Sequence, residues 1–413
     1  MPPHSHAAAV PDRPSAPGRA FIFFVGALVA IGPLSLDAYL PAMPAMAEAF
    51  GVSIVSLNNT ISVYLIGYGL GQFFGGAFSD QIGRKRIGTI GLLIFAVASV
   101  LIGFADNVIQ VQALRFVQAI GGGFATVICM ALIRDVYPVE ELGRRMAMVT
   151  LIMLASPVIA PSLGAVLLRF GWPSIFFFKA GYAIVLAGFY VLFVPETQPG
   201  RWSNISVATT LKQCAEVVTR RVDGILLPTL YALSMALAAA VFMTFLTNSS
   251  FAYIEYFGVS ETRFPIYFGL SIVGLIATNI YSMNRLTTEN AALFFRLGLR
   301  VQLVAVICLA TFVLIGLQSI WSVIVPVGVM VASFGLTGPA GSSRYMGLFD
   351  KLAGSASSLY TTLMFALGAI AGAISGVFFD GSLRPMVITM LIASLASNLL
   401  SLKIPTRKKA SIS

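Results

Sequence analysis

Twelve apolar stretches, each about as long as a bilayer is thick, follow one another along this chain and limit its fold more than any other feature. They lie near 20-45, 57-80, 87-105, 109-133, 146-169, 174-194, 224-248, 264-284, 297-317, 321-343, 355-379 and 384-403. Only 10% of the 413 residues are charged, whereas soluble globular domains carry roughly 25%. The sequence therefore predicts an all-α membrane protein with twelve transmembrane helices.

The longest polar break, Pro195 to Asp223, divides the spans into six and six. We therefore expect a cytoplasmic tail (1-19), an N-terminal six-helix bundle (20-194), a cytoplasmic linker (195-223), a C-terminal six-helix bundle (224-403) and a second cytoplasmic tail (404-413). Residues 48-53 and 255-260 both read Glu-x-Phe-Gly-Val-Ser, and each segment follows the first span of its bundle. This echo indicates that the halves are parallel repeats, an arrangement typical of transporters.

The basic residues indicate the orientation. With a cytoplasmic N-terminus, 21 of the 26 Lys and Arg residues fall on the cytoplasmic side. The five others are Arg115, Arg169, Lys179, Arg263 and Arg384. The positive-inside rule then places both termini in the cytoplasm. Because the basic residues are spread over many short loops, the net charge of +10 needs no nucleic-acid partner.

Neither a metal site nor an enzyme is predicted. Cys129, Cys214 and Cys308 are scattered without ligand spacing, and His4 and His6 lie in the polar N-terminal tail, which reads as disordered. The chain has no Gly-x-x-x-x-Gly-Lys-Ser/Thr loop for ATP. We expect no cofactor.

Asp37 is the only acidic residue well inside a span, and Pro41 and Pro44 break its span shortly afterwards. A carboxylate in the membrane costs roughly 2.5 to 3.5 kcal/mol by insertion scales and usually marks a path for ions or protons. Asp37 and Arg115 lie at similar depths, roughly 9 to 12 Å from the outer surface at 1.5 Å per residue. We expect them to pair when Asp37 is ionised, either to couple proton movement or as a static structural contact.

The second span ends in a loop with ordered glycines and charges, of which Gly76, Asp80, Gly83, Arg84 and Arg86 are the candidate functional residues. Asp80 lies at a helix C-terminus, where a negative charge is disfavoured, so it should need a cationic partner. This spacing favours a structured loop that takes part in conformational change. The alternative is a basic loop that only fixes the orientation of the helices in the membrane.

The fifth span contains Pro157, Pro161 and Gly164. Each proline removes a backbone donor and bends the helix. The bend could be a static kink or a hinge used in transport.

Four segments resemble the major facilitator superfamily and, within it, the drug:proton antiporters of the Bcr/CflA type. They are the loop 76-86, the first-span segment 36-44, the fourth-span segment 115-121 with Arg134-Asp135, and the fifth-span segment 155-165. The last departs from the usual antiporter motif, because Ala160 and Ala165 stand where glycines are common. The resemblance covers about residues 20 to 403.

The resemblance implies a monomeric, multi-pass protein of the bacterial inner membrane. Such a protein exchanges protons for drugs or similar small amphipathic molecules by alternating access. Two alternatives remain: a dedicated exporter of one metabolite, such as a siderophore or amino-acid derivative, and a non-pumping facilitator or sensor on the same scaffold.

Candidate cavity residues are aromatic, polar or flexible, as a permissive site requires. They are Tyr39, Gln118, Tyr231, Met235, Phe242 and Tyr360. Lys179, near the start of the sixth span, is expected to extend toward the outer surface of the membrane that the helix spans. The alternative is that it faces the cavity and favours anionic substrates.

Overall fold

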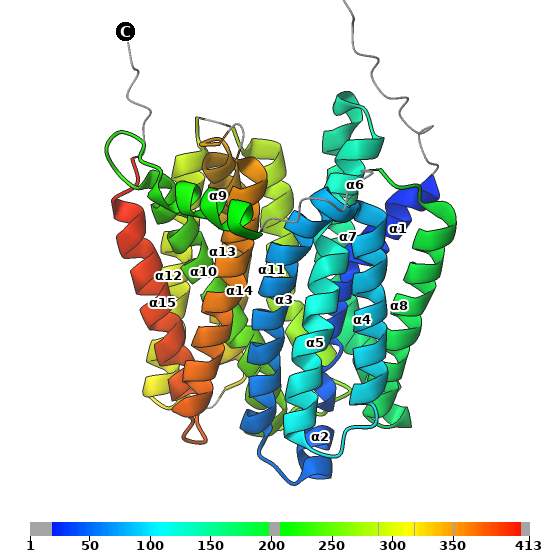
Figure 1. Cartoon of the computed structure of the whole chain (residues 1–413). Helices are drawn as coiled ribbons and strands as arrows, with labels where there is room; N and C mark the ends of the chain where they lie inside the picture. The colour runs from blue at the N-terminus through cyan, green and yellow to red at the C-terminus, as the bar shows by residue number, and fades with distance from the viewer. Residues whose placement is uncertain (1–18, 198–206, 288, 318, 350–351, 406–413) are drawn as a thin grey trace, which may run out of the picture.

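The computed structural model describes residues 19–405 except 198–206, 288, 318 and 350–351. The two predicted tails, including His4 and His6, lie almost entirely outside these described residues. Twelve helical spans occur in the described part of the chain, which confirms the predicted number. The fold is all-helical, as expected (Figure 1).

The first half comprises α1 (Arg19–Asp37), η1 (Leu40–Ala42), α2 (Met43–Phe50), α3 (Ile54–Ile82), α4 (Arg84–Ile102), α5 (Val108–Val127), α6 (Cys129–Val136), α7 (Val139–Leu167), η2 (Leu168–Phe170) and α8 (Pro173–Phe193). The second half comprises α10 (Leu227–Ser250), η4 (Phe251–Tyr256), α11 (Phe264–Arg285), α12 (Ala291–Leu314), α13 (Trp321–Met346), α14 (Ala353–Val377) and α15 (Arg384–Leu402). We call the side where α1 begins and α15 ends the termini face, and the opposite side, where α2 lies, the far face (Figure 1).

The segment between the halves contains a short amphipathic helix, α9 (Val207–Thr219), which lies across the second half at the termini face (Figure 1, green). Cys214 and Val217 on this helix are buried, and Val217 belongs to the apolar core of the second half. The predicted linker is thus partly helical, because one apolar stripe of the segment packs against the bundle.

The hydrophobic core is divided unequally between the two faces. Toward the far face, a single cluster joins the halves, with Ile61 and Phe245 among its members. Toward the termini face, Leu28 and Tyr190 belong to a cluster made only of first-half residues, and Met235 belongs to one made of the second half and α9. The halves are therefore packed together at the far face and have separate cores at the termini face.

Direct hydrogen bonds between the described residues of the two halves follow the same pattern. Near the far face, Asn58 Nδ2 donates to Asn248 Oδ1 at 3.4 Å. Near mid-depth, Thr362 Oγ1 donates to the Gly69 carbonyl oxygen at 3.3 Å. The contacts of α3 with α10 and α14 therefore hold the halves together from the far face to about the middle of the bundle.

Gly372 on α14 lies where these contacts are tight: a Cβ added there would be 3.0 Å from Ser62 Oγ and 3.1 Å from Thr247 Oγ1. We expect Gly372→Leu to push the halves apart at the far face, because neither α3 at Ser62 nor α10 at Thr247 leaves room for a branched side chain. Spin labels at Ser53→Cys and Thr262→Cys, both exposed, should then report a longer distance between the halves.

Gly354→Leu is the matched control on the same helix, since an added Cβ there meets nothing within 4 Å. An unchanged distance distribution in Gly372→Leu would show that the α3–α14 contact does not limit closure.

The repeated hexapeptide places a left-handed glycine after a helix in both halves, after the α-helix α2 in the first and after the π-helix η4 in the second. Gly51 and Gly258 have φ angles of +63° and +66°, a left-handed conformation that glycine adopts without a steric penalty. The next residue then turns back to the preceding helix: Val52 N donates to Ala47 O at 3.0 Å, and Val259 N donates to Tyr253 O at 2.9 Å. The repeated hexapeptide thus encodes a glycine turn that ends a helix in each half.

Candidate functional site

The first span is broken at Asp37, the last residue of α1. Pro41 has no N–H to donate to the Asp37 carbonyl, so the helix cannot continue, and the chain passes through a turn into η1. Because the helix stops before residue 39, the Ser35 carbonyl oxygen is free to accept other donors. The end of a half-helix, with its partial negative charge, therefore lies inside the bundle.

Two cationic side chains from different helices converge on that carbonyl oxygen. Arg115 on α5 donates from NH1 to Ser35 O at 3.1 Å, and Lys179 on α8 donates from Nζ to the same oxygen at 2.9 Å. The exposed fractions of Arg115 and Lys179 are 0% and 1%, and that of Asp37 is 3%. One acidic and two basic side chains, those of Asp37, Arg115 and Lys179, are thus buried around the end of α1; we call these three residues the charge cluster.

The position of Arg115 is fixed by further contacts. Its NH1 also donates to Ser35 Oγ at 3.0 Å and to Gln118 Oε1 at 2.8 Å, and Gln118 Nε2 donates to Ser99 Oγ at 2.6 Å. The guanidinium lies over the rings of Tyr39 and Tyr64, 4.9 and 4.3 Å from their centroids. Such contacts hold a buried guanidinium in one orientation.

The expected direct ion pair between Asp37 and Arg115 is not formed in this structure. Among the described residues, ion pairs join Arg84 to Asp135 and Arg145 to Glu141. Arg115 instead donates from NH1 to Ser35, two residues before Asp37, because the broken helix supplies an acceptor there, while its buried Nε and NH2 have no hydrogen-bond partner among the described residues. Arg115 therefore binds the same end of α1 that carries Asp37, but the two side chains are not direct partners, and their shared role in proton coupling stays a prediction.

The expectation that Lys179 extends to the membrane surface is wrong. Besides its hydrogen bond to Ser35, its Nζ lies 4.7 Å from the ring centroid of Phe176 and 5.8 Å from that of Tyr39. An acceptor at the end of α1 is available within the bundle, so the ammonium does not need to reach water. Lys179 therefore belongs to the charge cluster.

The fifth span packs its small residues against this break. Pro157 and Pro161 lie within the continuous helix α7, and Ala160 packs with Ala38 in a small apolar cluster. A Cβ added to Gly164 would lie only 2.0 Å from the Ala38 carbonyl oxygen. Glycine at 164 thus allows α7 to touch the turn next to Asp37. The proposed hinge at these residues stays a prediction.

The loop between α3 and α4 is structured, in agreement with its ordered spacing. Gly83 has a φ angle of +115°, which favours glycine, and it separates the two helices. The Arg84 side chain forms an ion pair with Asp135 at the end of α6. Gly76 lies inside α3, and Arg86 is exposed at the start of α4. The side chain of Asp80, and with it the expected cationic partner, lies outside the described residues.

Glu196, which the sequence pattern did not single out, holds this loop in place. Its carboxylate accepts hydrogen bonds from Arg84 N at 2.9 Å and Lys85 N at 3.1 Å, and Thr197 Oγ1 donates to Asp135 at 2.9 Å. A carboxylate is well placed at the N-terminus of α4, where free N–H groups and the helix dipole favour negative charge. The sequence signal is an acid directly after the sixth span.

The six candidate cavity residues separate into two groups. Tyr39, Gln118, Tyr231 and Met235 are at most 3% exposed, so they do not line open space in this state. Tyr39 and Gln118 instead contact Arg115 of the charge cluster. Phe242 and Tyr360 in the second half are partly exposed. Phe242 stacks on Phe334 with centroids 6.2 Å apart, and their role in cargo binding stays a prediction.

Curated relatives align with this chain, two of them over most of its length and one over less than half. A bicyclomycin resistance protein homolog of Haemophilus influenzae is 27% identical over 375 residues, covering 90% of this chain and 92% of its own. A multidrug resistance protein MdtL of Salmonella paratyphi B is 27% identical over 349 residues, covering 82% and 84%. A protein of the same name from Vibrio parahaemolyticus is 34% identical over 182 residues, which cover 44% of this chain and 46% of that protein.

Solved structures share the fold at low sequence identity. A D-xylose-proton symporter superposes with a TM-score of 0.73 at 14% identity, covering 94% of this chain and 98% of its own. A bacterial homolog of the lysosomal transporter Spinster, in an inward-facing and occupied conformation, superposes with a TM-score of 0.70 at 16% identity. The match covers 96% of this chain and 100% of the homolog. The family model described as Major Facilitator Superfamily matches residues 23–373. This chain belongs to the Major Facilitator Superfamily of membrane transporters, and the names of its bicyclomycin-resistance and multidrug-resistance relatives agree with the resemblance to the Bcr/CflA type.

Proposed function

We propose that this transporter exports drugs or similar small amphipathic molecules from the cytoplasm in exchange for protons. The observation that carries the proposal is the charge cluster: Asp37, Arg115 and Lys179 are buried together at a break in the first span. Ionisable groups are costly inside a membrane and are usually functional there. A single carboxylate at this position can carry the proton.

The termini face is assigned to the cytoplasm by the distribution of basic residues along the chain. The protein then resides in the inner membrane of a bacterium, as a monomer with both termini inside. The halves have separate cores toward the termini face and a joint core toward the far face. These features support an inward-facing state, in which cargo enters the space between the halves from the cytoplasm.

Proton exchange follows from the charges in the cluster. When Asp37 is ionised, it compensates one of the two cations; when it is protonated, both are uncompensated. A cargo that donates a hydrogen bond to the ionised carboxylate stabilises the ionised form and displaces the proton. Rocking of the halves then releases the cargo outside, where a proton replaces it. Gly164 and the prolines of α7 adjoin the cluster and are the proposed hinge.

The proton gradient is sufficient for this work. One proton entering across about 100 mV and one pH unit supplies roughly 3.7 kcal/mol, enough to hold a neutral cargo at about five-hundred-fold excess outside.

Lys179 narrows the proposed cargo class. Lys179 and Arg115 both donate to the carbonyl oxygen of Ser35, two residues before Asp37. The cluster therefore has two basic groups to one acid, an excess that disfavours a cation. We therefore propose neutral or anionic amphipathic cargo. The names of the relatives support drugs, including bicyclomycin, as candidates.

The function is tested in proteoliposomes with an imposed pH gradient. Bicyclomycin, an anionic dye and the cation ethidium serve as probes of three charge classes. We expect accumulation of the neutral and anionic probes against their gradients, collapse of accumulation when a protonophore is added, and a relative gain for ethidium in Lys179→Gln. If Lys179→Gln selects among the three probes as the parent protein does, the proposed role of Lys179 in charge preference is wrong.

The same experiment separates the alternative functions. Accumulation of one metabolite and none of the drug probes would identify a dedicated exporter. Equilibration without accumulation would identify a facilitator, and binding without flux would identify a sensor.

A further inference from the structure

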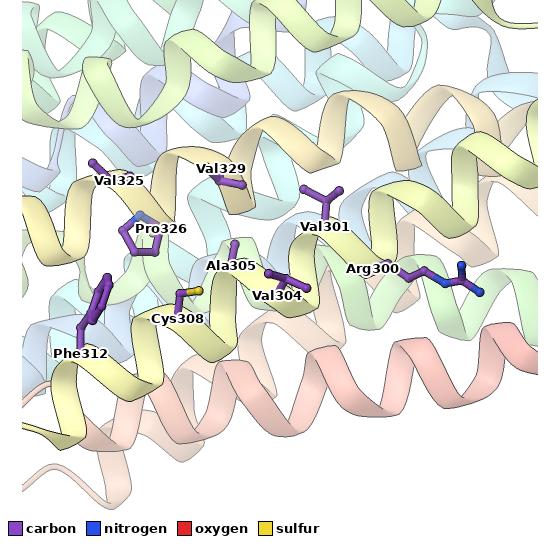
Figure 2. A pocket seen from close by; sticks show the side chains of 9 residues that line it. All are labelled: Arg300, Val301, Val304, Ala305, Cys308, Phe312, Val325, Pro326 and Val329. Atoms are coloured by element: carbon purple, nitrogen blue, oxygen red, sulfur yellow. The ribbon is translucent and has the colours of Figure 1, made fainter.

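A shallow apolar groove runs along α12 and α13 on the second half (Figure 2). Its volume is about 440 Å³, and it is far from the charge cluster, which lies in the first half. The residues that line it are Arg300, Val301, Val304, Ala305, Cys308, Phe312, Val325, Pro326 and Val329. Apart from Arg300 and the thiol of Cys308, every lining side chain is a hydrocarbon.

The groove lies on the membrane-facing side of the two helices. The exposed fractions of Val304, Val325 and Val329 are 60%, 58% and 44%, whereas Ala305 at the bottom is 4% exposed. Both helices are membrane spans, so the molecules that meet this surface are lipids. The small side chain of Ala305 leaves a hollow between the valines that one acyl chain can fill.

Arg300 introduces a charge at one end of this apolar surface. It is exposed and lies ten residues into the 24-residue helix α12, whose length of about 36 Å exceeds the roughly 30 Å hydrocarbon core. Its Cα is thus roughly 10 Å inside the hydrocarbon on the termini-face side. No described residue accepts a hydrogen bond from its guanidinium, in contrast to Arg296 one turn earlier, which donates to the Ile404 carbonyl oxygen.

The orientation of Arg300 shows where a partner must lie. In Figure 2 its side chain extends along α12 away from Cys308 and Phe312, toward the start of the helix. The guanidinium therefore approaches the headgroup region of the termini-face leaflet, as long basic side chains do in membranes. From Arg300 to Phe312 the groove runs about 18 Å along α12, a length comparable with one leaflet. It crosses mid-membrane near Val304, so a lipid with its phosphate at Arg300 would lie deeper than the surrounding lipids of the termini-face leaflet.

We propose that this groove binds one anionic glycerophospholipid, with its phosphate at Arg300 and an acyl chain lying along Ala305 and Cys308 toward Phe312. Charge complementarity selects an anionic headgroup, because an unpaired guanidinium within the hydrocarbon gains a partner only from the lipid. The apolar lining selects the acyl chain. A free phosphate ion lacks the chain and cannot use the groove.

Cys308 makes the occupant measurable, because it is exposed within the groove whereas Cys129 and Cys214 are buried. A bimane label on Cys308, in a chain with Cys129→Ala and Cys214→Ala, is quenched when a brominated acyl chain lies beside it. The purified protein is reconstituted into mixed phosphatidylglycerol and phosphatidylcholine vesicles in which one or the other lipid is brominated. The ratio of the two quenching efficiencies gives the headgroup preference at the groove.

We expect phosphatidylglycerol to be preferred about five-fold, the effect of one basic residue near a membrane surface. The preference should persist in Arg300→Lys and fall to about one in Arg300→Gln. Arg285→Gln removes an exposed arginine from the last turn of α11 and is the matched control that should leave the ratio unchanged.

Two outcomes would overturn the proposal. One is a ratio near one in the parent protein, which would mean that the groove is an ordinary lipid contact. The other is a preference that Arg300→Gln leaves intact or Arg285→Gln abolishes equally, which would mean that the general surface charge selects the lipid. If Arg300→Gln does not fold, Arg300→Met removes the same charge with a side chain suited to the hydrocarbon, and a preference that it leaves intact overturns the proposal in the same way.

Discussion

Replacing Asp37 with Asn is expected to abolish export against a concentration gradient. Asn has nearly the same shape but cannot carry a proton, so the charge cluster keeps two cations with no carboxylate to exchange protons. In proteoliposomes the accumulation of cargo, at most about five-hundred-fold for one proton, should fall to none. Flux down a cargo gradient should persist and become independent of the pH gradient.

Asp380→Asn is the matched control for this prediction. Asp380 is exposed in the loop between α14 and α15, where hydrogen bonds from the hydroxyl and backbone N–H of Ser382 lower the pKa of its carboxyl. It therefore stays ionised at every pH of the assay, and its replacement should leave accumulation unchanged. Normal accumulation by a correctly inserted Asp37→Asn variant would show that the proton travels elsewhere.

Gly164→Ala is expected to reduce transport by at least ten-fold through a steric clash alone. The added Cβ would lie 2.0 Å from the carbonyl oxygen of Ala38 and 2.8 Å from its carbonyl carbon, and backbone atoms cannot rotate away as a side chain can. The turn next to Asp37 or helix α7 must then move. Overpacking of this kind costs about 1–3 kcal/mol, so the thermal unfolding temperature of the purified protein should also fall.

Gly181→Ala provides the comparison, because an added Cβ at this position on α8 meets nothing within 4 Å. It should behave as the parent protein in both transport and unfolding. If Gly164→Ala is as stable and active as Gly181→Ala, the close approach of α7 to the break in α1 is not needed for function.

The fold could be predicted from the sequence because bilayer thickness determines span length and because no bilayer-spanning helix can leave its backbone unpaired. The twelve spans and the break after Asp37 follow from apolar windows and from prolines that lack an N–H. The divided core could not be predicted. Which halves of α3 and α14 touch depends on the conformational state, and one sequence adopts several states.

The charge cluster was predicted only in part, because counting residues along a helix gives depth but not direction. Depth brought Asp37 and Arg115 to one level correctly. It could not show that the Ser35 carbonyl, released by the helix break, would attract both Arg115 and Lys179. Glu196 was missed because its partners, the N–H groups of Arg84 and Lys85, lie more than a hundred residues earlier.

The central claim, that one buried acid exchanges its proton for cargo, is tested most directly by measuring protons released when cargo binds. Purified protein in weakly buffered solution with a pH-sensitive dye is mixed with bicyclomycin or whichever probe the vesicles accumulate. We predict release of up to one proton per parent molecule and none from the Asp37→Asn variant, although that variant still binds the probe. Equal proton release from both proteins would contradict the assignment of Asp37 as the proton carrier.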